Sequence, residues 1–320
     1  MKVHVMAMGG AFDTGLVTVL DTLKLANDFA TSKGMRVPFD VTVVGVRRTV
    51  RTQQGFGVPT QHVSNVDTPE LVIVPALGEM SSPELDVALK RRDIRDLKRR
   101  VGDWHASGAR LAAACTGTFV LAAAGLLDGL RATTSWWLAP DFRRRFPAVL
   151  LDDTRMVVET KGRITAGAAL AHIDLALWLV REQSPLLART TSRFLLFDGR
   201  PTQATYAMAD HIAHQDPIVE AFELWARGHL RDFSMSRAAK AVGTSQRTLQ
   251  RRVQQVLGCT PIHYVGDLRV DLARHRLETT DESIEEIAEA VGYSDGVTLR
   301  TLLRQRTGIG VRALRAQRME

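Results

Sequence analysis

Cys115 is the residue whose type and position most directly suggest chemistry. It lies in RLAAACTGTFVLAAAGLLDG, residues 110–129, where an apolar, strand-like run changes into a helix-like run of small residues. A cysteine nucleophile usually needs a base, most often histidine. We expect His105 on the surface of a preceding helix, and His172 buried on a late apolar helix with a backbone partner. Cys115 is therefore a catalyst, a ligand contact or neither.

The segments that must position Cys115 alternate between strand-like and helix-like patterns. KVHVMAM, FDVTVVGV, PELVIVPAL and ARLAAA are β-rich runs, whereas GLVTVLDTLKLANDFATSKG, DIRDLKRRVGDWHASG and AALAHIDLALWLVREQ have helical character. MVVETKGRITAG predicts a hairpin at Lys161-Gly162. This alternation predicts an α/β domain, with a doubly wound, mostly parallel sheet and helices on both faces.

The C-terminal part contains an internal repeat with a spacing of about 50 residues. SMSRAAKAVG and SIEEIAEAVG each begin at a potential N-cap serine and end at a glycine, and Ser283 and Glu286 have capping-box spacing. A second helical segment follows each copy, SQRTLQRRVQQVLG and DGVTLRTLLRQRTG. Helix, glycine-containing turn and helix predict two helix-turn-helix motifs in an all-α domain. The segment from Pro261 to Arg276 predicts a connecting helix of about 24 Å.

The region from about Ile218 to Arg315 resembles the AraC/XylS family of bacterial transcription regulators, through TSQRTLQRRV, GCTP and LRVDLARHRLETTDESIEEIAEAVGYSD. The resemblance implies that the second helix of each motif enters the major groove of double-stranded DNA. Arginine pairs well with guanine and glutamine with adenine, which suits side chains facing base edges. Arg247, Gln250 and Arg251 are predicted at base edges, and Arg252 and Arg304 at phosphates. The full predicted DNA-binding set is Ser245, Arg247, Thr248, Gln250, Arg251, Arg252, Thr298, Arg300, Thr301 and Arg304.

The second motif departs from the family pattern. LRTLL, residues 299–303, stands where family members often have aromatic-x-Arg-x-aromatic, so Thr301 occupies the usual arginine position. Arg300 is adjacent but rotated by about 100° around the helix. Gly296 and Val297 replace polar readers, and Val311 replaces the usual proline. We hypothesise that this motif reads fewer bases and depends more on backbone contacts and DNA shape.

The region from about Val3 to Arg193 resembles the PfpI-type, class I glutamine amidotransferase-like superfamily, through AAACTGTFVLAAAGLLDGLRATTSWW and ITAGAALAHIDLALWLV. In the catalytic relatives the cysteine lies at a strand-to-helix elbow, where the helix N-terminus lowers the thiol pKa. Gly117, which has no side chain, permits the close approach of the backbone at this elbow. The histidine of these relatives falls in a TTHW-like stretch about twenty residues later, where this chain has TTSW and therefore Ser135. The departure favours a non-catalytic domain.

Asp13, in GGAFDTG, matches an acidic position near the cysteine in some relatives, some of which use an Asp/Cys/Thr set. The simpler interpretation of Asp13 is an N-cap for the following helix. An alternative function is therefore a cysteine-dependent amidase or hydratase with an appended DNA-binding domain. We expect no catalytic residue and a ligand pocket at the elbow. Its candidate residues are Asp13, Cys115, Thr116 and Ser135.

Length and composition bound the remaining expectations. The length of 320 residues predicts two domains, and the presence of only two cysteines predicts a reducing compartment. The net charge of +7 gives weak support for a polyanionic partner. We expect a sensing or dimerisation domain at 1–195, a linker at 196–217 and a DNA-binding domain at 218–320. We further expect a cytoplasmic homodimer, an unknown small-molecule effector, no membrane segment, no metal and no cofactor.

Overall fold

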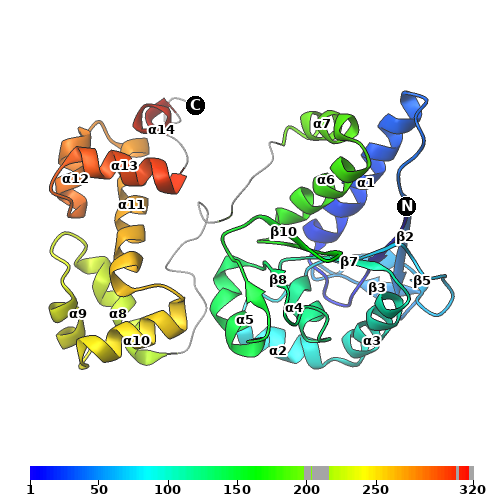
Figure 1. The fold of residues 1–320 in the computed structure, drawn as a ribbon, viewed down its shortest axis with the longest axis horizontal. Coiled ribbons are helices and arrows are strands. Elements are labelled where there is room, and N and C mark those ends of the chain that lie inside the picture. The colour runs from blue at the N-terminus through cyan, green and yellow to red at the C-terminus, as the bar shows by residue number, and fades with distance from the viewer. Residues whose placement is uncertain (198–202, 204–215, 308–309, 317–320) are drawn as a thin grey trace. The chain divides into compact units, whose positions relative to one another are not determined.

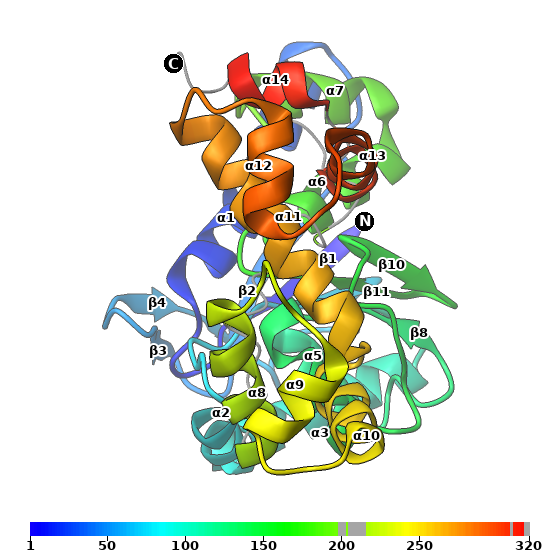
Figure 2. The same cartoon turned by 90° about the vertical axis from the view of Figure 1, so that its left-hand side faces the viewer.

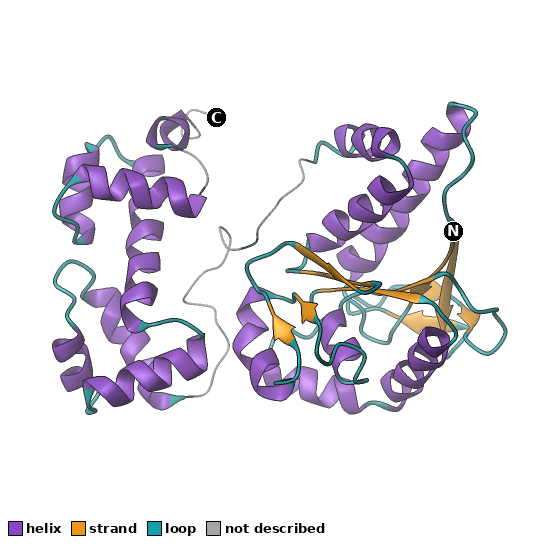
Figure 3. Ribbon diagram, viewed as in Figure 1, coloured by secondary structure: helices purple, strands orange, loops and turns teal. Residues whose placement is uncertain are grey.

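The computed structural model describes residues 1–197, 203, 216–307 and 310–316. It divides into two compact units, Met1–Ala204 and Thr205–Glu320, and the division falls within the predicted linker (Figure 1). The first unit combines strands and helices, whereas the described residues of the second form helices joined by short loops, with no strand (Figure 3). No helix of the described ranges is long and apolar enough to cross a membrane.

A seven-stranded sheet forms the centre of the first unit, in the order β10-β11-β7-β6-β1-β2-β5. All neighbouring pairs are parallel except β10 and β11, which form the predicted hairpin at Lys161-Gly162. The predicted mostly parallel sheet is thus confirmed. The strands are β1 (Lys2–Met6), β2 (Asp40–Gly45), β5 (Gln61–His62), β6 (Leu71–Val74), β7 (Arg110–Ala114), β10 (Val157–Thr160) and β11 (Arg163–Ala166).

Helices cover both faces of this sheet. One layer contains α1 (Asp13–Ser32), α6 (Ala171–Gln183) and α7 (Pro185–Phe194), and these three helices pack against one another (Figure 1). The opposite layer contains α2 (Ser82–Lys90), α3 (Arg92–Ala106), α4 (Gly117–Ala122) and α5 (Ala139–Arg145) (Figure 1). Two small strand pairs lie outside the main sheet: β3 (Thr49–Arg51) with β4 (Gly57–Pro59), and β8 (Arg131–Ala132) with β9 (Leu150–Leu151).

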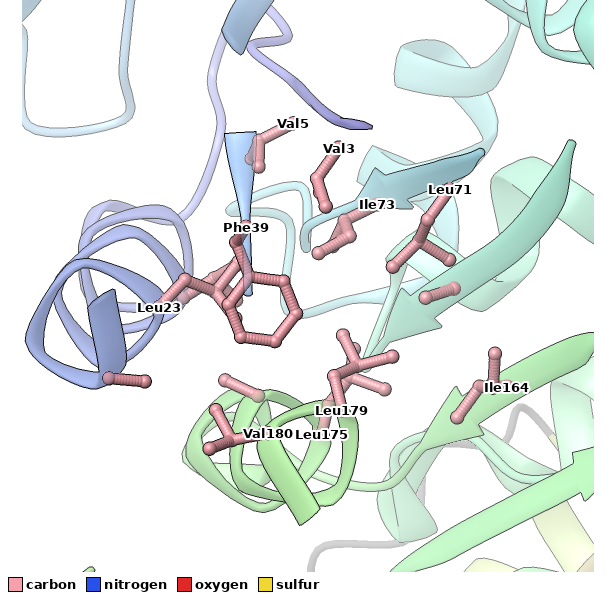
Figure 4. Close-up of a cluster of buried hydrophobic side chains, with 14 of the residues drawn as sticks. Val3, Val5, Leu23, Phe39, Leu71, Ile73, Ile164, Leu175, Leu179 and Val180 are labelled. Atoms are coloured by element: carbon pink, nitrogen blue, oxygen red, sulfur yellow. The ribbon is translucent and has the colours of Figure 1, made fainter. Parts of the chain in front are cut away.

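The core between the sheet and the α1–α6 layer follows from the apolar strand pattern. Alternate residues such as Val3 and Val5 on β1 turn toward Leu23 of α1, while Leu175 and Leu179 of α6 close the same space (Figure 4). These side chains are fully buried. Each contributes about 1.5–3 kcal/mol by burial, so the sheet and both helices depend on one shared core.

The second unit has two small cores joined by one long helix. The first core lies among α8 (Pro217–Gly228), α9 (Met235–Ala241) and α10 (Gln246–Leu257). The second lies among α12 (Ile284–Val291), α13 (Gly296–Thr307) and α14 (Val311–Ala316). The joining helix α11 (Pro261–Thr279) runs between the two groups of helices (Figure 2). It gives Tyr264 and Leu268 to the first core, and Ala273 and Leu277 to the second. It extends three residues beyond the predicted end at Arg276.

Candidate nucleic-acid interface and the Cys115 elbow

The first helix-turn-helix consists of α9 and α10, each with a serine at its N-terminus. Ser234 accepts a hydrogen bond from the Arg237 amide (3.3 Å), and Ser245 accepts one from the Thr248 amide (3.1 Å). Gly243 has a left-handed backbone conformation, with a φ of 67°, in the turn between the helices. Buried Leu249 and other apolar residues hold one face of α10 against the core. The opposite face of α10 therefore remains available to a partner.

The exposed face of α10 carries the side chains predicted at base edges. Arg247, Gln250 and Arg251 are all exposed, as is Gln254. Together with Thr248 they line a surface hollow of about 480 Å³. Donor-rich arginine and glutamine side chains on one helix face are suited to the edges of bases in a major groove.

Arg252 has a different environment from its neighbours. It forms an ion pair with Asp216 (2.7 Å), whose carboxylate also accepts hydrogen bonds from the amides of Ile218 and Val219 at the start of α8. Partial burial alone would raise the pKa of Asp216, but the bonds from Arg252 and these amides hold it below its ordinary value. The phosphate contact predicted for Arg252 would have to compete with this ion pair.

The second helix-turn-helix consists of α12 and α13. The predicted capping box is present, because Glu286 donates its amide to Ser283 (3.2 Å) and accepts the Ser283 amide (2.7 Å). Gly292 ends α12 in the left-handed conformation, with a φ of 93°. At the start of α13, Asp295 accepts hydrogen bonds from the amide and hydroxyl of Thr298 (2.7 and 3.0 Å). Thr298 thus has a local role in capping.

Two of the exposed polar side chains of α13 are already engaged in local contacts. Arg300 pairs with Glu285 (3.0 Å), and the Thr301 hydroxyl donates to the Val297 carbonyl of its own helix (3.1 Å). The Val297 side chain is 67% exposed, and Arg304 is also exposed. These contacts support the hypothesis that the second motif reads fewer bases.

Two sets of contacts join the motifs in addition to α11. Arg231, which follows α8, pairs with Glu289 of α12 (2.6 Å). Arg269 of α11 donates to the Leu230 carbonyl through Nε and Nη2 (2.9 and 2.6 Å) and lies over the Tyr293 ring. The spacing of the two motifs is therefore fixed by side chains as well as by the connecting helix.

The predicted elbow is present where β7 meets α4. Cys115 has a φ of 55°, an uncommon conformation for a residue other than glycine. Its amide donates to the carbonyls of Ala166 and Gly167 (3.0 and 2.9 Å). A Cβ at Gly117 would overlap the Val74 and Pro75 carbonyls, so the expected need for glycine there is confirmed.

The environment of the thiol differs from that of an activated nucleophile. Cys115 is 4% exposed, and its Sγ lies 3.0 Å from the Ser135 hydroxyl oxygen. Burial raises the pKa of the Cys115 thiol above its ordinary value. Burial therefore disfavours the thiolate, which is the nucleophilic form of a cysteine, although the backbone of an elbow is present.

His172 is buried and bonded to the backbone, as the sequence predicts. Its Nε2 accepts the Ala76 amide (3.1 Å), which leaves Nδ1 to donate to the Ala169 carbonyl (2.5 Å). Burial lowers the pKa of His172 to about 4. A Cβ at Gly15 would lie 2.7 Å from this ring, so glycine leaves the space that the ring occupies. His105 is partly buried rather than fully on the surface, because it contacts Ala109 and Arg163.

The other pocket candidates are also engaged. Thr116 is buried and donates its hydroxyl to the Leu77 carbonyl (2.7 Å), and Ser135 is fully buried. Asp13 is the first residue of α1 and accepts the Gln54 amide (3.0 Å). Its interpretation as an N-cap is wrong, because Phe12 occupies that position without a side-chain cap.

A cavity of about 600 Å³, which was not predicted from the sequence, lies beside the turn that follows β1. Gly9 and Gly10 line it, together with Arg47, Arg51 and Arg91. Arg91 is held by Glu79 (3.2 Å) and Asp93 (3.4 Å), whereas Arg47 and Arg51 are exposed. Ligands of open α/β sheets bind at this carboxyl end of the strands. The glycine pair after the first strand and the arginines of RRTVR were the available signals.

Comparisons with known proteins agree with this division. The family described as DJ-1/PfpI matches residues 1–182, and the family described as Helix-turn-helix domain matches residues 238–317. The HTH-type transcriptional regulator ArgR of Pseudomonas aeruginosa is 30% identical over 243 residues, 74% of this chain and 70% of that protein. The HTH-type transcriptional regulator GbdR of the same species is 28% identical over 235 residues, 70% of this chain and 64% of that protein.

The match to GbdR therefore spans slightly less than two thirds of that protein's length. Among solved structures, one from Vibrio parahaemolyticus has a TM-score of 0.52 at 24% identity, covers 61% of this chain and 98% of its own, and shows the fold of the first unit. With a DJ-1/PfpI domain over more than half of its length, and a regulator aligned across both units, the chain belongs to the AraC/XylS family of transcriptional regulators that carry an N-terminal DJ-1/PfpI domain.

Proposed function

We propose that this protein is a sequence-specific transcription regulator that binds double-stranded DNA through α10 and α13. The observation that carries the proposal is the duplicated helix-turn-helix, with an exposed arginine and glutamine face on α10 and a side-chain link between the motifs. We further propose that it acts in the cytoplasm as a homodimer, because a dimer would double the contacts to paired operator sites.

In the first step of the experiment, genomic DNA fragments that bind the purified full-length protein are recovered. A recovered fragment is then titrated with the wild type and with Arg251→Ala by fluorescence anisotropy. Loss of one bidentate base contact should weaken binding by about 1–3 kcal/mol. Arg99→Ala, which removes a 77% exposed arginine side chain from the first unit, is the charge-matched control. Equal affinities for Arg251→Ala and the control would contradict the proposal.

The first unit is proposed to sense a small anionic molecule. The elbow candidates Cys115, Thr116 and Ser135 are buried, whereas the cavity beside Gly9 and Gly10 is open and has exposed arginines at its edge. A ligand that binds only the folded state at 100 times its Kd would stabilise it by about 2.7 kcal/mol. Acetate, succinate and citrate can be screened by thermal unfolding, with Arg51→Ala as the variant that should lose the response. A response unchanged in Arg51→Ala would place the ligand elsewhere.

The alternative, a cysteine-dependent amidase or hydratase, is supported by the elbow backbone and opposed by the burial of the Cys115 thiol, which raises its pKa. We propose that Cys115 is not catalytic. If Cys115→Ser abolished a measured turnover of small amides while DNA binding and promoter control survived, the enzymatic function would replace this proposal for the first unit.

A further inference from the structure

Gln203 lies within the predicted linker, yet its side chain is only 1% exposed. Its Nε2 donates to the Thr133 hydroxyl oxygen (3.1 Å) and to the Thr134 carbonyl (2.8 Å). Its Oε1 accepts the Ala168 amide (3.0 Å), and its own amide donates to the Thr154 carbonyl (3.0 Å). The side-chain carboxamide therefore uses both of its donors and its acceptor in the first unit.

The groups around Gln203 match a carboxamide in shape and polarity. The Thr133 hydroxyl donates to the Arg155 carbonyl (3.0 Å), so its oxygen is left to accept from Gln203. A Cβ at Gly167 would overlap the Gln203 carboxamide, so a larger residue there would force this side chain to shift. A glutamate at position 203 would place its carboxylate against the Thr133 hydroxyl oxygen and the Thr134 carbonyl, and it could not donate to either.

This socket, formed by Thr133, Thr134, Gly167 and Ala168, is continuous with the Cys115 elbow. Thr134 donates its hydroxyl to the Cys115 carbonyl (2.8 Å), and the Gly167 carbonyl accepts the Cys115 amide (2.9 Å). Two of its four residues therefore also hold the strained cysteine.

We propose that the socket is a carboxamide-binding site whose occupant is Gln203, and that its occupation anchors the connecting segment to the elbow. Gln203 lies 13 residues before Asp216, whereas Leu195, at the end of α7, lies 21 residues before it. Occupation thus removes eight residues from the connection to the DNA-binding unit, or up to about 28 Å of extended chain. The inference goes beyond the proposed function and does not depend on DNA binding.

Two variants of the full-length protein test this anchor without DNA. Gln203→Glu keeps the side-chain shape but loses both donors, and Gly167→Ala excludes the side chain without changing the connecting segment. Gly102→Ala, where an added Cβ meets nothing within 4 Å, is the matched control. The readouts are hydrogen exchange at the Ala168 amide and the maximum dimension in small-angle X-ray scattering.

Both variants should exchange the Ala168 amide about tenfold faster or more, because several hydrogen bonds that resist local opening are lost. Both should also increase the maximum dimension, whereas the control should change neither quantity. Unchanged exchange in Gln203→Glu would overturn the socket. Faster exchange with an unchanged maximum dimension would overturn the anchor. If Gly167→Ala does not fold, Gln203→Glu alone decides both points.

Discussion

At the scale of single residues, the surroundings of the Cys115 thiol and of the His172 ring explain what the elbow can do. Ser135 supplies a hydroxyl 3.0 Å from the Cys115 sulfur, at the sequence distance where catalytic relatives have histidine. Gly15 leaves room for the His172 ring, which is bonded to backbone groups. The thiol therefore has a hydroxyl neighbour that cannot act as a base near neutral pH. The Cys115 amide donates hydrogen bonds to two carbonyls, and these bonds maintain the strained backbone of this residue.

The two cysteines should differ strongly in reactivity. Cys115 is nearly inaccessible and its thiol pKa is raised by burial, whereas Cys259 is partly exposed. In the native protein at pH 7.5, iodoacetamide should modify Cys115 at least about tenfold more slowly than Cys259, because the thiolate is the reactive form. Mass spectrometry of the two peptides measures both rates, and denatured protein is the control. Similar native rates would show that the elbow thiol is activated or accessible.

His172 should make the stability of the first unit depend on pH. Its pKa is about 4 in the folded state, against 6.5 for an unperturbed histidine, because burial disfavours the charged form. The contribution of neutral His172 to the free energy of unfolding is therefore complete above pH 6.5. It is lost as the pH falls toward 4, by up to about 3 kcal/mol. Urea unfolding between pH 7.5 and 4 measures this loss. His172→Gln should be less stable at pH 7.5 and show a shallower decline; a parallel decline would assign the effect to other groups.

At the scale of elements, local sequence signals placed most helices and strands correctly. The hairpin at Lys161-Gly162 and the capping box of Ser283 and Glu286 depend on neighbours in sequence, so their patterns were sufficient. The Asp13 N-cap was wrong because the chain enters α1 one residue earlier, at Phe12. The partner of Arg252 could not be predicted, because Asp216 is 36 residues away and meets it only after packing.

The candidate sites were also predictable to different degrees, because some depend on neighbours in sequence and others on residues that meet only after packing. The exposed face of α10 follows from helical periodicity, since buried Leu249 fixes which side chains turn outward. The docking of Gln203 onto Thr133 crosses 70 residues and leaves no local pattern. The cavity beside Gly9 and Gly10 likewise combines a strand end with distant Arg91.

The Asp216 cap should stabilise the first helix-turn-helix through both the amides of α8 and Arg252. Asp216→Ala should lower the free energy of unfolding of the DNA-binding unit by about 1–2 kcal/mol, because an N-cap acceptor is lost and Arg252 is left unpaired. Asp216→Asn should recover most of the cap. Asp232→Ala, which removes an exposed ion pair with Arg237, should have a smaller effect. Chemical denaturation measures all three, and equal losses for Asp216→Ala and Asp232→Ala would argue against the cap.

At the scale of the whole molecule, the DNA-binding unit presents two unequal surfaces at a fixed spacing. The helix α11 has 19 residues and is therefore about 28 Å long, somewhat less than the roughly 34 Å of one turn of DNA. Arg269 and the Arg231–Glu289 pair restrict movement of one motif relative to the other. In the proposed complex, binding by α10 would thus also hold α13 at the next groove, even where α13 makes few base contacts.

This inequality predicts different costs for matched substitutions in the two motifs. Gln250→Ala on α10 should weaken binding to a recovered genomic fragment by about 1–3 kcal/mol, because its exposed amide is available to a base. Thr301→Ala should cost less than about 0.5 kcal/mol, since its hydroxyl already bonds to the Val297 carbonyl. Anisotropy titrations at several salt concentrations measure both, and the salt slope should be unchanged in each neutral substitution. A loss of several kcal/mol in Thr301→Ala would instead make α13 a base-reading helix of equal importance.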